Sequence, residues 1–350
     1  LAEALKAGGY ATGVIGKWHL TGYANHGAVE VPPSEHGFDE VIVSENRGIA
    51  GGSYFHPYHF NRGVKARLLN VRHPATGRMT EYLTDRLNLE AVEFIERHKD
   101  EPFFLYKSHY AVHTRLNGRP DLVAKYSRKP NAGVKPHSSR NNVHLAAQLE
   151  VIDRGVGMIV HKLRELDLLQ RTLIVFTSDN GGETRVTSNA PLRGGKSMLY
   201  EGGIREPLII HWPAVVPAGS VCDVPVCTVD FYPTFLDAAG IRPPAGHILD
   251  GLSLMPLLRN PDGSLPRQTL YWHYPLKRPH FLGGRSAGAI RHGDWKLLEF
   301  FDDGHVELYN LAHDLGEQRN LSHRLPQKAA ELQQQLRCWR ARVGATRPGA

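Results

Sequence analysis

A short apolar segment, Leu173–Thr177, runs directly into the polar sequence Ser178-Asp179-Asn180-Gly181-Gly182. Its apolar and β-branched residues, bounded by polar turn formers, predict a strand with both faces buried. In an open α/β sheet, ligands bind in the crevice beyond the carboxyl ends of the strands. Asp179 and Asn180 therefore offer a carboxylate and an amide oxygen to a hard cation or a polar ligand. The alternative is a plain Asx-turn, because Asp, Asn and Gly are the usual turn formers.

Short apolar runs alternate with helical patterns along the first 240 residues, which predicts an α/β fold with a mainly parallel central sheet covered by helices. The predicted strands, besides Leu173–Thr177, are Gly13–Gly16, Pro102–Tyr106 and Leu208–His211. The predicted helices are Leu1–Ala7, Leu83–Lys99, Leu145–Leu166 and, behind an Asp230 N-cap, Phe231–Ala239. Residues 21–78 show little periodicity and are expected to form a wall of the binding pocket.

Gly155 and Gly157 interrupt the long helical pattern that begins at Leu145. Glycine in a helix interior costs roughly 1 kcal/mol relative to alanine. We therefore expect both glycines to mark a close approach to a neighbouring element.

The pattern changes after the proline- and glycine-containing run from Leu258 to Gln268. Three further strand patterns are separated by Gly293-Asp294 and Asp303-Gly304, which predicts an antiparallel meander. These strands are Ala287–Ile290, Trp295–Glu299 and Val306–Tyr309, and a helical pattern from Leu325 to Val343 follows them. The predicted organisation is a domain over residues 1–268 and a small α+β subdomain over residues 269–350.

The formal net charge of +7, with 20 histidines, favours anionic partners. Lysine and arginine are dispersed along the chain without a basic run, so nucleic-acid binding is not expected and a small anionic ligand is. No apolar run approaches the ~20 residues of a membrane helix. The three cysteines, Cys222, Cys227 and Cys338, lack zinc spacing. A Cys222–Cys227 disulfide and three unpaired thiols both remain open.

Further polar side chains follow the other predicted strands of the sheet. Lys17 and His19 come after Gly13–Gly16, and they would point the same way on an extended segment. His109 and His113 lie beyond Pro102–Tyr106, and Lys196 stands beside Gly194-Gly195. If the carboxyl ends of these strands share one edge, two lysines, imidazoles and the Asp179–Asn180 pair can surround an oxyacid ester. Lysines stabilise developing negative charge, and an imidazole transfers protons near neutral pH.

Four sequence stretches resemble motifs of the type I sulfatase family and occur in the family's order. They are Gly9–Leu20, Thr177–Gly182, Leu192–Lys196 and Tyr200–Pro207. The resemblance implies an alkaline-phosphatase-like fold, hydrolysis of a small sulfate ester such as a sulfated glycan or an aryl sulfate, and a periplasmic or secreted location. It also selects His113 over His109 as the active-site histidine, although Val112 and Arg115 depart from the family's proline-containing pattern.

The same resemblance implies a role for each candidate residue. Asp179 and Asn180 would be ligands of Ca²⁺, which takes six to eight oxygen ligands. Lys17 and Lys196 would neutralise the sulfate oxygens. His113, with Lys196, would assist departure of the alcohol, and His19 would take a proton during expulsion of sulfate.

The family's nucleophile, a formylglycine made from a Cys-x-Pro-x-Arg or Ser-x-Pro-x-Arg motif, has no counterpart between Leu1 and Ala350. Leu1 already lies in a helical pattern, so the expectation is an amino-terminally truncated portion of a sulfatase, with the remaining metal ligands upstream. The alternatives are a catalytically silent anion-binding protein and a phosphatase or phosphodiesterase of the same superfamily. The Asp179–Asn180 pair and the Gly16-Lys17-Trp18-His19 motif disfavour the two-zinc sites of the phosphatases. The natural substrate and the oligomeric state are left open.

Overall fold

The structure is a computed structural model that describes residues 1–20, 31–44, 53–56, 81–135 and 138–346. The chain forms two compact units. The first comprises Leu1–Pro136, Asn141–Leu173 and Trp212–Gly263, and the second comprises His137–Arg140, Ile174–His211 and Ser264–Ala350. Residues Ile174–His211 thus group with the carboxyl-terminal residues, whereas the sequence pattern placed them in a domain of residues 1–268.

The first unit is built on a parallel sheet in the order β2-β1-β3. These strands are β1 (Ala11–Lys17), β2 (Glu40–Ser44) and β3 (Phe103–Ser108). The central strand β1 is buried, with Val14 and Ile15 fully inaccessible. Gly16 has φ 120°, and a Cβ there would lie 1.7 Å from the carbonyl oxygen of Ser108, so only glycine lets β1 and β3 approach this closely.

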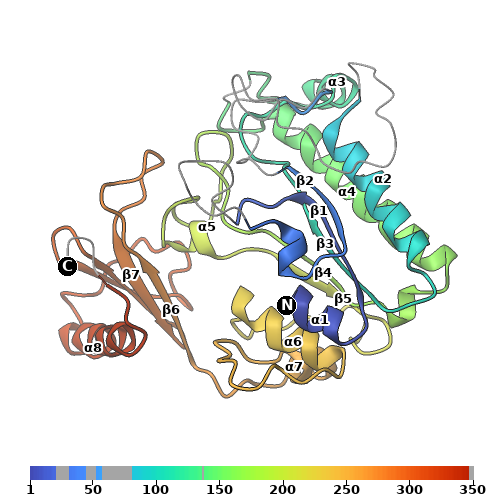
Figure 1. The fold of residues 1–350 in the computed structure, drawn as a ribbon. Coiled ribbons are helices and arrows are strands. Elements are labelled where there is room, and N and C mark those ends of the chain that lie inside the picture. The colour runs from blue at the N-terminus through green and yellow to red at the C-terminus, as the bar shows by residue number, and fades with distance from the viewer. Residues whose placement is uncertain (21–30, 45–52, 57–80, 136–137, 347–350) are drawn as a thin grey trace. The chain divides into compact units, whose positions relative to one another are not determined.

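Helices cover both faces of this sheet, as predicted (Figure 1). On one face Phe94 of α2 (Leu83–Arg97) contacts Phe103, and α4 (Val143–Glu165) packs on α2. On the other face lie α1 (Ala2–Ala7) and α6 (Phe231–Ala238), whose Phe235 contacts Phe104 of β3. The unit also contains α3 (Pro120–Ser127), α7 (Met255–Arg259) and the 3₁₀ turns Pro33–His36, Leu169–Arg171 and Thr228–Asp230.

Two helix details differ in part from expectation. Gly155 does mark a close approach, since a Cβ there would lie 2.3 Å from the side chain of Asn88 on α2. Gly157 does not, because nothing lies within 4 Å of such a Cβ. Asp230 precedes α6 as predicted, but its carboxylate accepts hydrogen bonds from the backbone N–H groups of Cys227 and Leu252 and does not cap the helix.

The second unit contains a two-stranded sheet of β4 (Ile174–Thr177) and β5 (Leu208–His211), followed by β6–β9 and α8. The prediction that Leu208–His211 extends a parallel sheet is wrong, because β5 pairs with β4 in the antiparallel direction. The predicted burial of both faces of β4 is also wrong. Phe176 is 37% exposed and Ile209 of β5 is 60% exposed, because the described sheet has only these two strands.

The carboxyl-terminal meander is confirmed and gains one strand. The antiparallel order is β6-β7-β8-β9, from β6 (Thr269–Tyr274), β7 (Ala287–His292), β8 (Trp295–Phe300) and β9 (Val306–Asn310). The helix α8 (Pro326–Arg342) packs Leu332 and Leu336 on Ile290, Leu297 and Leu308. Sequence inspection missed β6, whose residues are all only partly buried.

The structure describes residues 21–78 only in part. The stretch 21–78 contains the strand β2, and its parts 21–30, 45–52 and 57–78 lie outside the described residues, so the predicted pocket wall stays a prediction. All three cysteines are free thiols. Among the described residues, no helix combines the length and apolarity needed to cross a bilayer.

Candidate functional site

Lys17 is the last residue of β1 and is partly buried at the carboxyl end of the strand. The next residue, Trp18, is only 7% exposed and packs against His36 and the edge of Phe38. His19 is exposed and has φ 51°, in the left-handed region. Because β1 ends at Lys17, His19 lies beyond the strand, and the expectation that the two side chains point the same way stays a prediction.

His113 is held five residues beyond β3 by a chain of tyrosine hydrogen bonds. The Tyr110 hydroxyl donates to the Gly16 carbonyl (2.9 Å), which ties this loop to the end of β1. The buried Tyr54 hydroxyl donates to the carbonyl oxygens of Tyr110 (2.8 Å) and His113 (3.1 Å). Burial raises the pKa of Tyr54 well above its usual value, so this donor stays protonated.

The imidazole of His113 has a defined tautomer when it is neutral. Its Nδ1 lies 2.5 Å from the carbonyl oxygen of Thr114, so Nδ1 carries the proton that this carbonyl accepts. Nε2 is then the nitrogen that can accept a proton and, once protonated, return it to a ligand.

Lys107 and His109 form a pair of neighbouring titratable side chains that was not predicted from the sequence. The Lys107 Nζ lies 3.4 Å from Nδ1 of His109, near the end of β3. Burial lowers the pKa of Lys107 to about 7. Burial, and then the positive charge of Lys107, lower the pKa of His109 well below its usual value. The spacing of Lys107 and His109, two positions apart at the end of β3, could have indicated this pair.

Replacing Lys107 with methionine is expected to remove a pH dependence of stability. The lysine has a pKa of about 7 in the fold and about 10.5 when unfolded, so unfolding takes up a proton between these values. The free energy of unfolding therefore rises as the pH increases from 7 to 10.5 and is lowest below 7. Lys107→Met should flatten this slope and stabilise the chain at pH 7 by on the order of 1 kcal/mol. Denaturant titrations at pH 7 and 9.5 measure both effects.

The control for this experiment is Lys135→Met, because Lys135 is an exposed lysine of the same unit. It should leave the pH slope as it is in the parent chain. An unchanged slope in Lys107→Met would show that Lys107 is not desolvated.

In the second unit, the Asp179–Gly182 turn follows β4 and packs against the glycines of α5 (Glu201–Ile204). The N–H of Gly181 donates to the carbonyl of Gly203 (3.1 Å). A Cβ on Gly181 would lie 1.8 Å from the carbonyl oxygen of Gly202, so this close packing requires glycine. Asn180 donates through Nδ2 to the carbonyl of Gly181 (3.1 Å), which leaves its amide oxygen as the atom that can ligate a cation.

Glu206 brings a second carboxylate close to Asp179. Burial, and then the negative charge of Asp179, raise the pKa of Glu206 to about 7. Its Oε1 is buried without a hydrogen-bond partner. Two carboxylates and an amide oxygen suit a hard cation such as Ca²⁺ in type but supply fewer ligands than it takes. No cluster of three or more His, Cys, Asp or Glu side chains able to hold a metal occurs within the described ranges.

Asn189 ties the Asp179 turn to Lys196, and sequence inspection missed it. Its Nδ2 donates to the carbonyls of Gly182 (2.9 Å) and Gly194 (3.0 Å), and its Oδ1 accepts from the N–H of Gly182 (2.9 Å). The N–H of Lys196 donates to the same Gly182 carbonyl (3.2 Å). The backbone at Lys196 is thus hydrogen-bonded to the turn that begins with Asp179 and Asn180. Lys17, His19 and His113 belong to the other unit.

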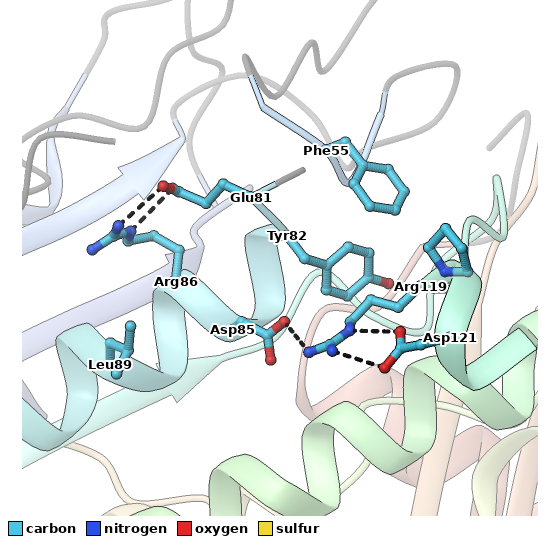
Figure 2. A pocket seen from close by; sticks show the side chains of 9 residues that line it. Phe55, Glu81, Tyr82, Asp85, Arg86, Leu89, Arg119 and Asp121 are labelled. Atoms are coloured by element: carbon cyan, nitrogen blue, oxygen red, sulfur yellow. Dashed lines mark hydrogen bonds and ion pairs between the residues drawn. The ribbon is translucent and has the colours of Figure 1, made fainter. Parts of the chain in front are cut away.

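A separate hollow of about 670 Å³ in the first unit is not the predicted site (Figure 2). Phe55 and Tyr82 form part of its lining, and none of the six predicted residues lines it. Its cations are already paired, Arg86 with Glu81 and Arg119 with both Asp85 and Asp121. With three carboxylates against two guanidinium groups, this lining gives no preference for a sulfate group.

The parallel sheet with helices on both faces, the antiparallel carboxyl-terminal sheet and the glycine-rich Asp179–Lys196 assembly define an α/β protein of the alkaline-phosphatase-like class. The family profile described as "Sulfatase" matches residues 1–241, and the profile "N-sulphoglucosamine sulphohydrolase, C-terminal" matches residues 195–342. The chain therefore belongs to the sulfatase family, as its motifs implied.

Individual relatives agree with this assignment. A sulfatase of Formosa agariphila is 34% identical over 74% of this chain and 50% of its own length. The N-acetylgalactosamine-6-sulfatase of Canis lupus familiaris is 32% identical over 78% of this chain and 50% of its own length. The crystal structure of Ps i-CgsB in complex with a neocarrahexaose superimposes with a TM-score of 0.78 at 29% identity, covering 97% of this chain and 73% of that one. The chain spans about half the length of these two curated relatives.

Proposed function

We propose that this chain carries much of the active site of a sulfuric ester hydrolase that releases inorganic sulfate from a sulfated carbohydrate or an aryl ester. The observation that supports this best is the assembly in which Asn189 and the Gly182 carbonyl link Lys196 to the Asp179–Asn180 turn. This assembly links a lysine that can bind an anionic ester to two residues whose oxygen atoms can bind a metal ion. The named relatives favour a sulfated glycan over an aryl ester, since one acts on an N-acetylgalactosamine 6-sulfate and another was crystallised with a neocarrahexaose.

The cofactor of the proposed enzyme is Ca²⁺. Asp179 and Asn180 would hold it, and the buried, unpartnered Oε1 of Glu206 is a third oxygen close to this pair. When bound, the cation supplies positive charge that polarises the sulfate group and activates the nucleophile. The formylglycine nucleophile and the remaining metal ligands belong, in this proposal, to residues that precede Leu1.

The protein's own residues have separate roles in the proposal. Lys17 and Lys196 bind sulfate oxygens and neutralise the charge that grows on them in the transition state. His113, oriented by its Nδ1 bond to the Thr114 carbonyl, delivers a proton from Nε2 to the departing alcohol. His19, exposed at the end of β1, accepts the proton that is lost as inorganic sulfate leaves.

The test is to recover the coding region upstream of Leu1 and to measure sulfate release by the restored protein. A Cys-x-Pro-x-Arg or Ser-x-Pro-x-Arg motif, together with sulfate release from a sulfated galactosamine or carrageenan oligosaccharide, is the expected result. Binding of sulfated sugars without turnover would support the catalytically silent alternative. Turnover of phosphate esters alone would support the phosphatase or phosphodiesterase.

Asn189→Ala is expected to lower kcat/KM for the sulfate ester by about tenfold to a hundredfold, because it frees the turn that places Asp179 relative to Lys196. The matched control is Ser188→Ala, which alters the neighbouring exposed residue. Steady-state kinetics of both variants make the comparison. Equal kinetics of the two variants would show that the three Asn189 hydrogen bonds are not needed for activity.

A further inference from the structure

Three ionisable side chains, one of them on α5, are buried together in the second unit. Lys296 on β8 and Glu317 beyond β9 are both 0% exposed, and Glu201, the first residue of α5, is 2% exposed. The Lys296 Nζ lies 2.8 Å from Oε1 of Glu201 and 2.9 Å from Oε1 of Glu317. The Oε2 of Glu317 accepts the backbone N–H of Glu201 (2.7 Å). We call these three residues the buried triad.

The buried triad is sensitive to the loss of its one cation. Lys296 has two carboxylate partners, so its removal would leave two buried carboxylates close to each other, of which Glu201 keeps the half-exposed Arg205 at 3.8 Å. Breaking a buried ion pair by removing one partner is strongly destabilising, whereas replacing all the charges by neutral groups of similar shape is tolerated. Loss of Lys296 alone should therefore disturb the surroundings of Glu201 more than neutralising all three side chains together.

The residues that follow Glu201 in α5 contact the turn that carries the predicted metal ligands. The next two residues, Gly202 and Gly203, are those on which Gly181 packs, and the carbonyl of Gly203 accepts the Gly181 N–H (3.1 Å). The Gly202 N–H donates to the carbonyl of Arg193 (2.8 Å). The Arg193 guanidinium in turn donates to the backbone carbonyl of Glu317 (2.9 Å). One side of the Asp179–Lys196 assembly is thus tied to the triad through the backbone of α5, and the other through the Arg193 side chain.

We propose that Lys296, Glu201 and Glu317 are positioning residues through which the carboxyl-terminal sheet holds the Asp179–Asn180 turn in its ligand-binding geometry. The triad touches neither a substrate nor a metal in this proposal. It acts through α5, whose glycine carbonyls support the turn. The metal-dependent part of this inference rests on the proposed function, whereas the support of the turn does not.

The first experiment measures backbone hydrogen exchange in the 350-residue chain by mass spectrometry. Lys296→Met should accelerate exchange about tenfold in peptides covering residues 178–205, while peptides from β7 and from α8 change less than about threefold. The triple variant Lys296→Met/Glu201→Gln/Glu317→Gln removes all three charges and should restore protection of residues 178–205. Lys328→Met, which removes a cation from an exposed pair with Glu331 on α8, is the control and should change neither region.

A uniform acceleration across the second unit, or no acceleration in residues 178–205, would overturn the proposal in favour of a general stabilising role. If Lys296→Met does not fold, Glu317→Gln is used. It keeps Lys296 paired with Glu201 and should accelerate the same peptides by about threefold.

The second experiment uses the active sulfatase and separates metal binding from chemistry. Lys296→Met should raise the Ca²⁺ concentration for half-maximal activity by about tenfold, with kcat at saturating Ca²⁺ and KM for the ester within about threefold of the parent. A loss of kcat that saturating Ca²⁺ does not restore would contradict a role through the metal ligands. If the protein restored with its upstream residues hydrolyses no sulfate ester, the proposed function fails. The exchange experiment on the 350-residue chain still decides whether the triad positions the turn.

Discussion

Lys196→Ala is expected to lower kcat/KM for sulfate-ester hydrolysis by about 10²- to 10³-fold, because removing one preorganised charge from a transition-state site has an effect of this size. The backbone N–H of Lys196 donates to the Gly182 carbonyl. The Asn189 side chain donates to the carbonyls of Gly182 and Gly194, and so links the residues on either side of this bond. The backbone that carries the ammonium group is thus fixed beside the Asp179 turn before any ligand arrives. Initial-rate kinetics on a sulfated oligosaccharide measure the loss.

Two companion variants separate charge from folding. Lys328→Ala removes a partly exposed lysine of the same unit and should leave kcat/KM unchanged. Lys196→Arg keeps the positive charge in a different shape and should recover part of the activity. Lys196 is partly buried but belongs to no helix or strand, so the alanine variant should keep the thermal unfolding midpoint of the parent. Undiminished turnover in Lys196→Ala would remove this residue from the active site.

The strands and helices of the first unit could be predicted from the sequence because their signals are local. The helical period of α4 and the buried run of β1 each arise within one element, and the structure confirms the helix and the strand. The face that α4 buries was predicted only in part, since Ile152 and Leu163 are buried but Leu149 is 50% exposed. The left-handed backbone of His19 and the packing of Trp18 against Phe38 could not be predicted, because the strand period contains neither. The antiparallel pairing of β5 was missed for a similar reason, since the direction of a strand depends on its partner and not on its own residues.

The candidate site shows the same division between local and long-range information. Asp179, Asn180 and Lys196 were found because each lies in a glycine-rich motif. Asn189 was missed because its surroundings look like an ordinary polar loop, and only its three hydrogen bonds to residues five and seven positions away reveal its role. The buried triad could not be predicted from local patterns, because Glu201 and Lys296 are 95 positions apart in the sequence.

Asp179→Ala is expected to weaken Ca²⁺ binding to the active protein by about 100-fold or more, because calcium affinity follows the number of charged oxygen ligands. Asp179 supplies a full negative charge, whereas Asn180 supplies only a neutral amide oxygen, so the loss at Asp179 should exceed the loss in Asn180→Ala. Isothermal titration calorimetry with Ca²⁺ measures both variants. The control is Asp302→Ala, which removes an exposed carboxylate paired with Arg285 in the same unit and should leave the titration as in the parent. An identical calorimetric curve for Asp179→Ala and the parent would rule out Asp179 as a ligand, and the Ca²⁺ site would then have to be sought away from the β4 turn.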